Sequence, residues 1–351
     1  MSVTSDLLLV GSLPADSAEA ALRAGGELFG DLTFALPDGE TGPRAAWVGY
    51  ERERLMRPAA GIETVEDTAS PTGIPRHAYE TPIFRLATEE LRFEGWPRID
   101  DAIASYALFR RLREEGAIPH GLRFQVCLPF PSSALNALKA DFAHDFPIAE
   151  RAFEDLFARE LRRLLDDVPA EDLALQWDVC YEVLDLEGVV AWFPEDGAWE
   201  RFASPVARLT AQIPEDVLVG YHLCYGTFPE WPMYEARDMG VIVRMANHAV
   251  QASGRRVDWL HLAGPRYLRS EDERFFAPLA ELEPGDARVF LGIVLPIDGI
   301  PGLRRRYRTA SKYLSDFGVA MYCGFGRQPG QDGMETMREH RRVVTAVRRQ
   351  A

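Results

Sequence analysis

The sequence is poor in lysine. Only Lys139 and Lys312 occur among its 39 basic residues, and both fall in segments that we expect to be helical. A Schiff-base lysine at a strand end is therefore excluded. No Gly-x-Gly-x-x-Gly follows a predicted strand, which disfavours dinucleotide binding of the Rossmann type. The nucleophile elbow typical of serine hydrolases is missing too.

Positive charge, long apolar runs and clustered cysteines are also lacking. The net charge of −15 disfavours a nucleic-acid partner, because phosphate binding needs clustered Lys and Arg. No apolar stretch reaches the about 18 residues of a membrane span, and no signal peptide is recognisable. We therefore predict a cytoplasmic protein with small-molecule partners and no membrane contact. The four cysteines are far apart, which predicts reduced thiols rather than a disulfide framework.

Short β-rich runs alternate with longer amphipathic segments, a pattern typical of a parallel sheet covered by helices. Helical spacing is clearest at Ile148–Leu165 and Glu335–Val347. Eight strand-helix units favour an α/β fold, a single (β/α)8 TIM barrel over residues 1–351, with an open doubly wound sheet as the alternative. The predicted strands are 7–10, 32–36, 122–128, 173–179, 217–224, 257–262, 287–295 and 318–323.

One segment, 45–98, does not fit a minimal barrel. It separates the second strand from a helix expected to begin near Ile99, and it is rich in Pro, Gly and charged residues, including Ser70-Pro71-Thr72-Gly73-Ile74-Pro75. Long loops in compact domains are often lids or binding loops. We predict an insertion that is a lid or binding loop or, alternatively, a surface excursion or a contact in a homo-oligomer.

Active sites in this architecture use residues at the carboxyl ends of the strands. The second strand is followed by Asp38, Glu40 and Arg44 among glycines. This run offers carboxylates, backbone donors and an anion-binding guanidinium. A tight turn explains the glycines but not the charged residues, so we predict a substrate-binding role for them.

Polar residues also alternate along the fourth strand and beyond it. Gln176, Asp178, Cys180 and Glu182 share one face if the strand is regular. A carboxylate at this end could bind an ammonium group or act as a general base. We predict a catalytic role for Asp178 and a substrate-binding role for Glu182, with loop capping as the structural alternative for both.

The end of the fifth strand carries His222 and Cys224, which lie two residues apart and so share a face. The eighth strand ends at Cys323, a second thiol at the same rim. Imidazole and thiolate are good zinc ligands, and three of them would leave an open position for catalysis. Each cysteine alone could instead be a small buried hydrophobic residue. The coincidence of all three at strand ends favours a metal site.

These strand ends resemble the catalytic barrel of cobalamin-independent methionine synthase over nearly the whole chain. The superfamily also contains uroporphyrinogen decarboxylase and zinc-dependent coenzyme M methyltransferases, so the resemblance indicates the fold better than the reaction. The matching segments occur in the family's order: Val10-Gly11-Ser12-Leu13-Pro14, Gln176-Trp177-Asp178, His222-Leu223-Cys224-Tyr225 and Cys323-Gly324-Phe325.

The resemblance implies Zn2+ as cofactor. It implies substrate contacts at Ser12 and Asp178, and zinc ligands at His222, Cys224 and Cys323. In the family, zinc activates a substrate thiol, which becomes a deprotonated nucleophile on binding the metal. A methyl or other alkyl transfer from a small alkyl donor to a thiol is the implied reaction.

The match departs from the family at three points. The family's glutamate ligand at the end of the sixth strand falls on Ala263. His261, two residues earlier on the same face, either replaces that ligand or contacts substrate as a catalytic residue. Val179 and Cys180 follow Asp178 where the family has Glu-Pro, and the chain has no room for the N-terminal domain of the longer methionine synthases. Neither homocysteine nor a folate donor is therefore implied.

Two other functions stay open at this point. A metal-free decarboxylase or lyase of the uroporphyrinogen decarboxylase type would use Arg44, Asp38 and Asp178 as charge stabilisers, with the cysteines as packing residues. A binding barrel without catalysis is the other, and Ala263 supports it because it removes an expected ligand. Metal content discriminates between the zinc enzyme and the first of these.

Overall fold

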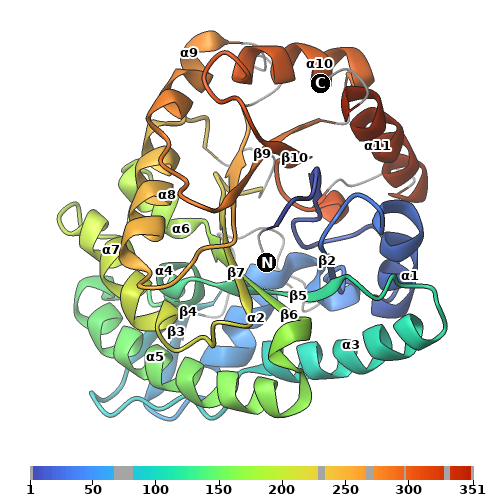
Figure 1. Ribbon diagram of the computed structural model, residues 1–351. Coiled ribbons are helices and arrows are strands. Elements are labelled where there is room, and N and C mark those ends of the chain that lie inside the picture. Colours follow the sequence, from blue (N-terminus) through green and yellow to red (C-terminus); the bar gives the residue numbers. More distant parts are fainter. Residues whose placement is uncertain are drawn as a thin grey trace.

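Eight strands form one parallel sheet in the computed structural model, which describes residues 3–66, 82–227, 234–265, 272–295, 298–327 and 333–348. Their order around the sheet is β1-β10-β9-β8-β7-β6-β5-β2 (Figure 1). They are β1 (Leu7–Leu8), β2 (Ala35–Pro37), β5 (Arg123–Pro129), β6 (Leu173–Val179), β7 (Leu218–Leu223), β8 (Trp259–Ala263), β9 (Arg288–Val294) and β10 (Gly318–Met321).

The two edge strands meet just beyond their carboxyl ends. Ser12 and Gly39 form an isolated parallel bridge, and the Leu13 backbone N–H donates to the Gly39 carbonyl at 2.9 Å. The sheet is thus nearly closed, and the predicted (β/α)8 barrel is confirmed. All eight predicted strands overlap an observed one, although β1 and β2 are shorter than predicted.

Helices surround the sheet on its outer side (Figure 1). Local sequence explains where several of them begin: Ser17 and Asp141 cap helices by accepting from the backbone N–H groups of Ala20 and His144, and Pro97 occupies a first helical position. The main helices are α1 (Ala18–Phe29), α3 (Pro97–Glu114), α5 (Phe142–Asp167), α7 (Ala198–Thr210), α8 (Gly240–Ala252), α10 (Gly299–Ala310) and α11 (Gly333–Arg348), with the short α4 (Pro131–Leu135), α6 (Tyr181–Leu186) and α9 (Glu273–Phe276) between them.

The segment between β2 and α3 has secondary structure of its own. It contains α2 (Trp47–Met56) and an antiparallel hairpin of β3 (Ile62–Glu66) and β4 (Ile83–Leu86). The Pro- and Gly-rich stretch 70–75 lies outside the described residues. A lid function for this segment therefore stays a prediction.

Two apolar clusters follow from the alternation of side chains along the strands. Leu7 and Leu9 belong to the large cluster between sheet and helices, whereas Leu8 and Val10 belong to a smaller one. The smaller cluster joins strands from all around the sheet and so fills the barrel interior. Its members are Val3, Leu8, Val10, Ala35, Ala174, Leu218, Trp259, Phe290 and Ala320.

Above this apolar layer, the inward-facing positions become polar. In β6, Ala174 is followed by Gln176 and Asp178 at the next two inward positions. In β7, Leu218 is followed by Gly220 and His222, and in β8, Trp259 is followed by His261. The inner polar residues include Gln125, Gln176, Asp178, His222 and His261, each at most 7% exposed. The barrel therefore has a hydrophobic floor and a buried polar layer toward its carboxyl end.

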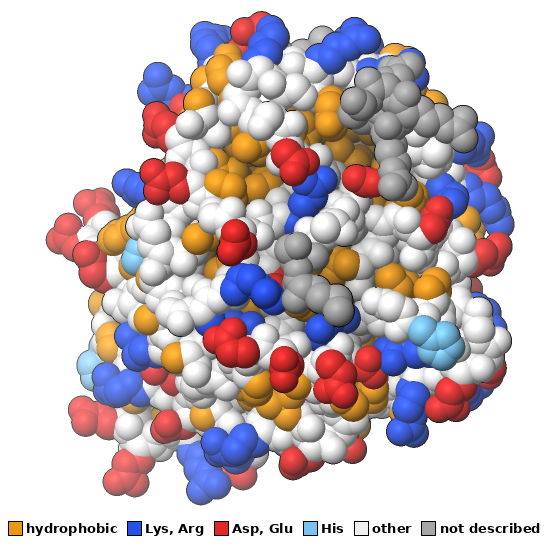
Figure 2. Space-filling model, in the orientation of Figure 1, with side chains coloured by type: hydrophobic (Ala, Val, Ile, Leu, Met, Phe, Trp, Pro, Cys, Tyr) orange, Lys and Arg blue, Asp and Glu red, His pale blue; other side chains and the backbone are white. Residues whose placement is uncertain are grey.

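Charges of both signs are dispersed over the molecular face in Figure 2, between small patches of hydrophobic side chains. Lysine and arginine side chains do not gather into one patch on this face. No helix in the described part of the chain combines the length and the apolar character that crossing a membrane requires.

The close packing of Gly220 against Trp259 at the floor of the barrel predicts a loss of stability on substitution. A Cβ at Gly220 would lie 2.1 Å from ring atoms of Trp259, so Gly220→Ala forces the indole to move within a packed core. We expect a loss of about 1–3 kcal/mol in the free energy of unfolding, measured by urea denaturation. Gly121→Ala is the control, because nothing lies within 4 Å of its built Cβ. Equal stabilities of the two variants would contradict this packing.

Candidate metal and substrate site

The three residues proposed as metal ligands come together at the carboxyl end of the barrel. His222 lies in β7, Cys224 follows the end of β7, and Cys323 comes two residues after β10. One ligand atom from each lies within 4.8 Å of the other two. His222 and Cys224 are buried, and Cys323 is partly buried. One nitrogen and two sulfurs at this spacing fit the donor set of a zinc site.

The thiols of this cluster do not ionise readily without a nearby cation. Contact with Cys180 and burial raise the pKa of Cys224 well above its usual value. Contact with Cys224 and burial likewise raise the pKa of Cys323. Both thiols would be protonated at neutral pH unless a positive charge compensates their thiolates. A bound metal ion supplies that compensation, so the electrostatics of the cluster also fit a metal.

A second imidazole orients the first. His222 and His261 are paired in register on β7 and β8, with their Nδ1 atoms 2.5 Å apart. His261 Nε2 lies 3.0 Å from the Met321 carbonyl. Burial lowers the pKa of His261 to about 3, so its ring is neutral and carries one proton.

The tautomers follow from these contacts. A carbonyl can only accept, so the single proton of His261 is on Nε2 and is donated to Met321. His261 Nδ1 must then accept from the Nδ1–H of His222. This leaves the lone pair of His222 on Nε2, which is the form that a metal-binding imidazole requires. Both ring nitrogens of His261 therefore take part in hydrogen bonds, one with His222 and one with the Met321 carbonyl.

A fourth sulfur borders the cluster. Cys180 directly follows β6, whose last residue, Val179, is paired with Leu223 of β7. The Cys224 backbone N–H donates to the Val179 carbonyl at 3.0 Å, and the Cys180 and Cys224 thiols are in contact. The sequence predicted that Cys180 shares the face of Asp178, but not that it meets Cys224.

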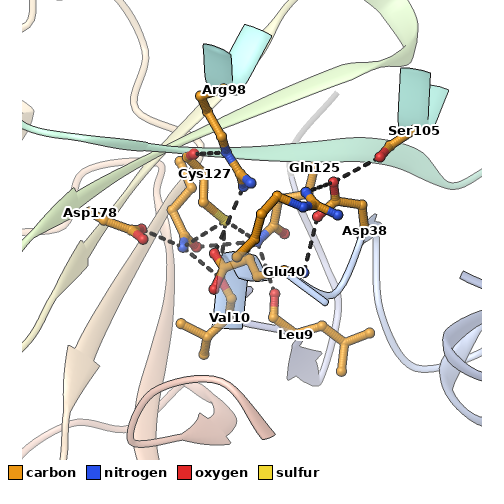
Figure 3. Close-up of polar contacts among 11 residues, drawn as sticks. Leu9, Val10, Asp38, Glu40, Arg98, Ser105, Gln125, Cys127 and Asp178 are labelled. Atoms are coloured by element: carbon orange, nitrogen blue, oxygen red, sulfur yellow. Dashed lines mark hydrogen bonds and ion pairs between the residues drawn. The ribbon is translucent and has the colours of Figure 1, made fainter. Parts of the chain in front are cut away.

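A second buried cluster lies beside the first. Glu40, Cys127 and Asp178 bring two carboxylates and a thiol within 4.8 Å of one another, as Figure 3 shows. Burial and the charge of Glu40 raise the pKa of Asp178 well above its usual value. Arg98 Nη2 lies 3.8 Å from Glu40. Two carboxylates held this close favour either a shared proton or a cationic ligand.

Backbone geometry and glutamine side chains hold these carboxylates in place. Glu40 has a φ of 48°, a left-handed conformation that is uncommon for a residue other than glycine and is frequent at functional sites. Gln176 Nε2 donates to Asp178 Oδ1 at 2.8 Å and to the Val10 carbonyl at 2.6 Å. Gln125 Nε2 donates to the Leu9 carbonyl at 2.9 Å.

Asp38 and Arg44 contact each other at the edge of this cluster. Arg44 Nη1 lies 2.5 Å from Asp38 Oδ2, and Ser105 Oγ donates to the same oxygen at 2.9 Å. Burial acts to raise the pKa of Asp38, but the charges of Arg98 and Arg44 lower it overall. The contacts support the loop that carries Glu40, since the Glu40 N–H donates to Asp38 Oδ1 at 3.2 Å.

Ser12 lies where the two clusters approach the first strand. Its hydroxyl is buried and has no hydrogen-bond partner among the described residues. A Cβ at Gly324 would lie 2.0 Å from this hydroxyl, and one at Gly11 would lie 3.0 Å from Glu40 Oε1. These glycines let the first and last strand ends approach closely. The unsatisfied hydroxyl fits a polar group of a ligand.

Glu182 belongs to neither cluster. Its carboxylate accepts from the Ser133 N–H at 2.9 Å and from the Ser133 hydroxyl at 2.7 Å, so it links α6 to the first turn of α4. Its substrate-binding role stays a prediction, and these contacts are those of the capping alternative.

The sequence analysis did not identify Cys127 or Arg98. Cys127 alternates with Gln125 along β5 as Asp178 does with Gln176 along β6, so strand alternation was the signal that could have found it. Arg98 lies in α3, where Arg98 Nε donates to the Cys127 carbonyl at 2.9 Å. No sequence pattern places that contact.

The cluster of His222, Cys224 and Cys323 and the acidic cluster are neighbours. Asp178 and His222 are paired in register on β6 and β7, and Asp178 interacts electrostatically with Cys323. The two clusters therefore adjoin each other at the carboxyl end of the barrel.

Comparisons with known proteins agree with this architecture. The chain is similar to the structure of a putative vitamin-B12-independent methionine synthase from Listeria monocytogenes, at 13% sequence identity and a TM-score of 0.60, over 97% of this chain and 96% of that one. It is also similar to a B12-independent methionine synthase from Shewanella sp. W3-18-1 in complex with selenomethionine, at 14% identity and a TM-score of 0.62, over 99% and 98% of the two chains.

No family model and no curated protein matches the chain. At these identities the structural likeness establishes a shared fold. The resemblance to the catalytic barrel of cobalamin-independent methionine synthase is thus confirmed at the level of the barrel.

The hydrogen bond between His222 and His261 predicts that His261 positions His222 to bind a metal ion. His261→Ala removes the acceptor that fixes the His222 tautomer, so we expect zinc affinity to fall about 10–100-fold, measured by chelator competition. His248→Ala is the control, because that ring packs against Trp199 on the outer helices. Unchanged affinity in His261→Ala would show that His222 needs no such support.

Glu182 predicts a pH dependence of stability. Burial raises its pKa from 4.5 to about 7, so the folded state binds this proton more tightly than the unfolded state does. This contribution is fully present below pH 4.5 and is lost at about 1.4 kcal/mol per pH unit as the pH rises toward 7. Glu182→Gln removes the loss. Urea denaturation should show the variant gaining up to about 3 kcal/mol over wild type across this window, and a constant difference would contradict the burial argument.

Proposed function

We propose that the protein is a zinc-dependent thiol methyl- or alkyltransferase. The observation that carries the proposal is the convergence of His222, Cys224 and Cys323 within 4.8 Å, with His222 held in the tautomer that places its lone pair on Nε2. A metal-free decarboxylase or a binding barrel does not require these groups to converge. When bound, zinc supplies a deprotonated substrate thiol at neutral pH, where a free thiol is mostly protonated.

The acidic cluster supports an acceptor thiol that also carries an ammonium group. An ammonium between Glu40 and Asp178 would offset the cost of ionising Asp178, whose pKa burial raises. The hydroxyl of Ser12 could accept from the ammonium or donate to an adjoining carboxylate. These residues would fix one end of the acceptor while its sulfur is directed to His222, Cys224 and Cys323.

Binding measurements with three related compounds test whether one cluster recognises the ammonium group and the other the sulfur. Homocysteine carries both groups, 4-mercaptobutanoate lacks the amine, and homoserine has oxygen in place of sulfur. We expect homocysteine to raise the Tm of the zinc-loaded protein most, and Asp178→Asn to reduce its advantage over 4-mercaptobutanoate. Equal shifts with homocysteine and homoserine would contradict sulfur recognition.

A reaction test follows from the thiol chemistry. We expect about one zinc per chain in the purified protein, and faster methylation of homocysteine by methyl iodide with the protein than without it. Cys323→Ser removes one ligand from the cluster, so both the zinc content and the rate enhancement should fall by at least about tenfold. Methylation is followed by mass spectrometry. A wild-type protein without zinc, or an unchanged Cys323→Ser variant, would overturn the proposal.

A further inference from the structure

We infer that Arg98 is a specificity-determining residue, which limits the acidic cluster of Glu40, Cys127 and Asp178 to a ligand with one positive charge and excludes a divalent metal ion from it. The inference rests on the proposed function, because this cluster is where the ammonium group of the acceptor is proposed to bind. Its basis is the ion pair between the buried side chains of Arg98 and Glu40.

Arg98 enters the cluster from α3 and is fixed at both ends. It follows Pro97, the first residue of the helix, and the preceding Trp96 is buried. At the other end, Arg98 Nε donates to the Cys127 carbonyl at 2.9 Å, and Nη2 lies 3.8 Å from Glu40 Oε1 (Figure 3). Arg98 is only 3% exposed. The guanidinium is therefore held beside the cluster and shielded from water.

The three residues of the acidic cluster would suit a metal ion if this guanidinium were absent. Their two carboxylates and one thiol lie within 4.8 Å of one another, and carboxylate oxygens are the ligands that Mn2+, Mg2+ and Ca2+ prefer. A metal ion between Glu40 and Asp178 would share Glu40 with the guanidinium of Arg98. Like charges repel strongly at such a distance in a buried site. Arg98 thus opposes a divalent ion in the cluster.

The number of buried charges sets the same limit. The carboxyl groups of Asp38, Glu40 and Asp178 are each at most 7% exposed. Arg44 pairs with the first and Arg98 with the second. A guanidinium does not lose its proton in a protein, so both positive charges are permanent. One ammonium group balances the third carboxylate, whereas a divalent ion would leave a buried positive charge uncompensated, which is costly.

Mn2+ binding to the whole purified protein, loaded with zinc beforehand, tests the inference. Bound Mn2+ is counted from the loss of the electron paramagnetic resonance signal of the free ion. We expect the cluster of the wild type to bind no Mn2+. Arg98→Met removes the charge and keeps much of the side-chain volume. It should bind about one Mn2+ per chain, at least about tenfold more tightly than the wild type binds this ion. Adding Asp178→Asn to Arg98→Met should abolish this binding, because it removes a ligand.

Two further variants separate the charge of Arg98 from its shape. Arg98→Lys loses the planar fork of the guanidinium but keeps a cation beside Glu40, so it should bind no more Mn2+ than the wild type. Arg44→Met removes the same charge from the neighbouring ion pair with Asp38, which lies outside the group of three. It should likewise create no Mn2+ site. If Arg98 only held the loop in place, neither Arg98 variant would gain Mn2+.

The outcomes separate this inference from the proposed function. Mn2+ bound by the wild type and lost in Asp178→Asn would overturn the inference without any arginine variant having to fold. An Arg98→Met protein with a wild-type circular dichroism spectrum that binds no Mn2+ would also overturn it, as would equal Mn2+ binding by Arg98→Lys or Arg44→Met.

Each of these results leaves the proposed function standing, because that function depends on zinc at His222, Cys224 and Cys323. A wild type that holds no zinc would overturn the proposed function. The Mn2+ count is made in the same way on such a protein, so the role of Arg98 is still decided by it.

Discussion

Closure of the parallel sheet is the constraint on which the site depends. Because all eight strands run in one direction, their carboxyl ends meet at one rim, and because side chains alternate, every second residue faces the common interior. Ser12, from the start of the chain, and Gly324, from near its end, are thereby brought into contact. Strand direction and alternation together convert scattered polar residues into two adjoining clusters.

Concentrating polar groups in this interior is costly, and the structure offsets the cost unevenly. Asp38 is compensated by Arg44 and Arg98, which lower its pKa despite burial. Asp178, Cys224 and Cys323 are not compensated in this way, and their pKa values are raised. The uncompensated groups are those that face one another across the two clusters. Such a distribution is expected where a cationic ligand completes the charge balance.

Sequence alone predicted the barrel because its signals are local: runs of β-forming residues, their spacing and their alternation. It also placed His222, Cys224 and Cys323 at one rim, because strand ends converge in any such barrel. It could not reveal the contact of Cys180 with Cys224, or the pairing of His222 with His261. Those depend on the register between neighbouring strands and on rotamers, which no single-strand pattern encodes. Arg98 was missed for a related reason, since it reaches the site from a helix.

The same register explains how this site can lack the glutamate of the methionine synthase pattern. Ala263 is paired with Gly292 on β9, and a Cβ at Gly292 would lie 3.0 Å from His261 Nε2. These small residues leave no carboxylate on the β8 side and keep room for the His261 ring. On this side the His222 ring is therefore met by a second imidazole rather than by a carboxylate.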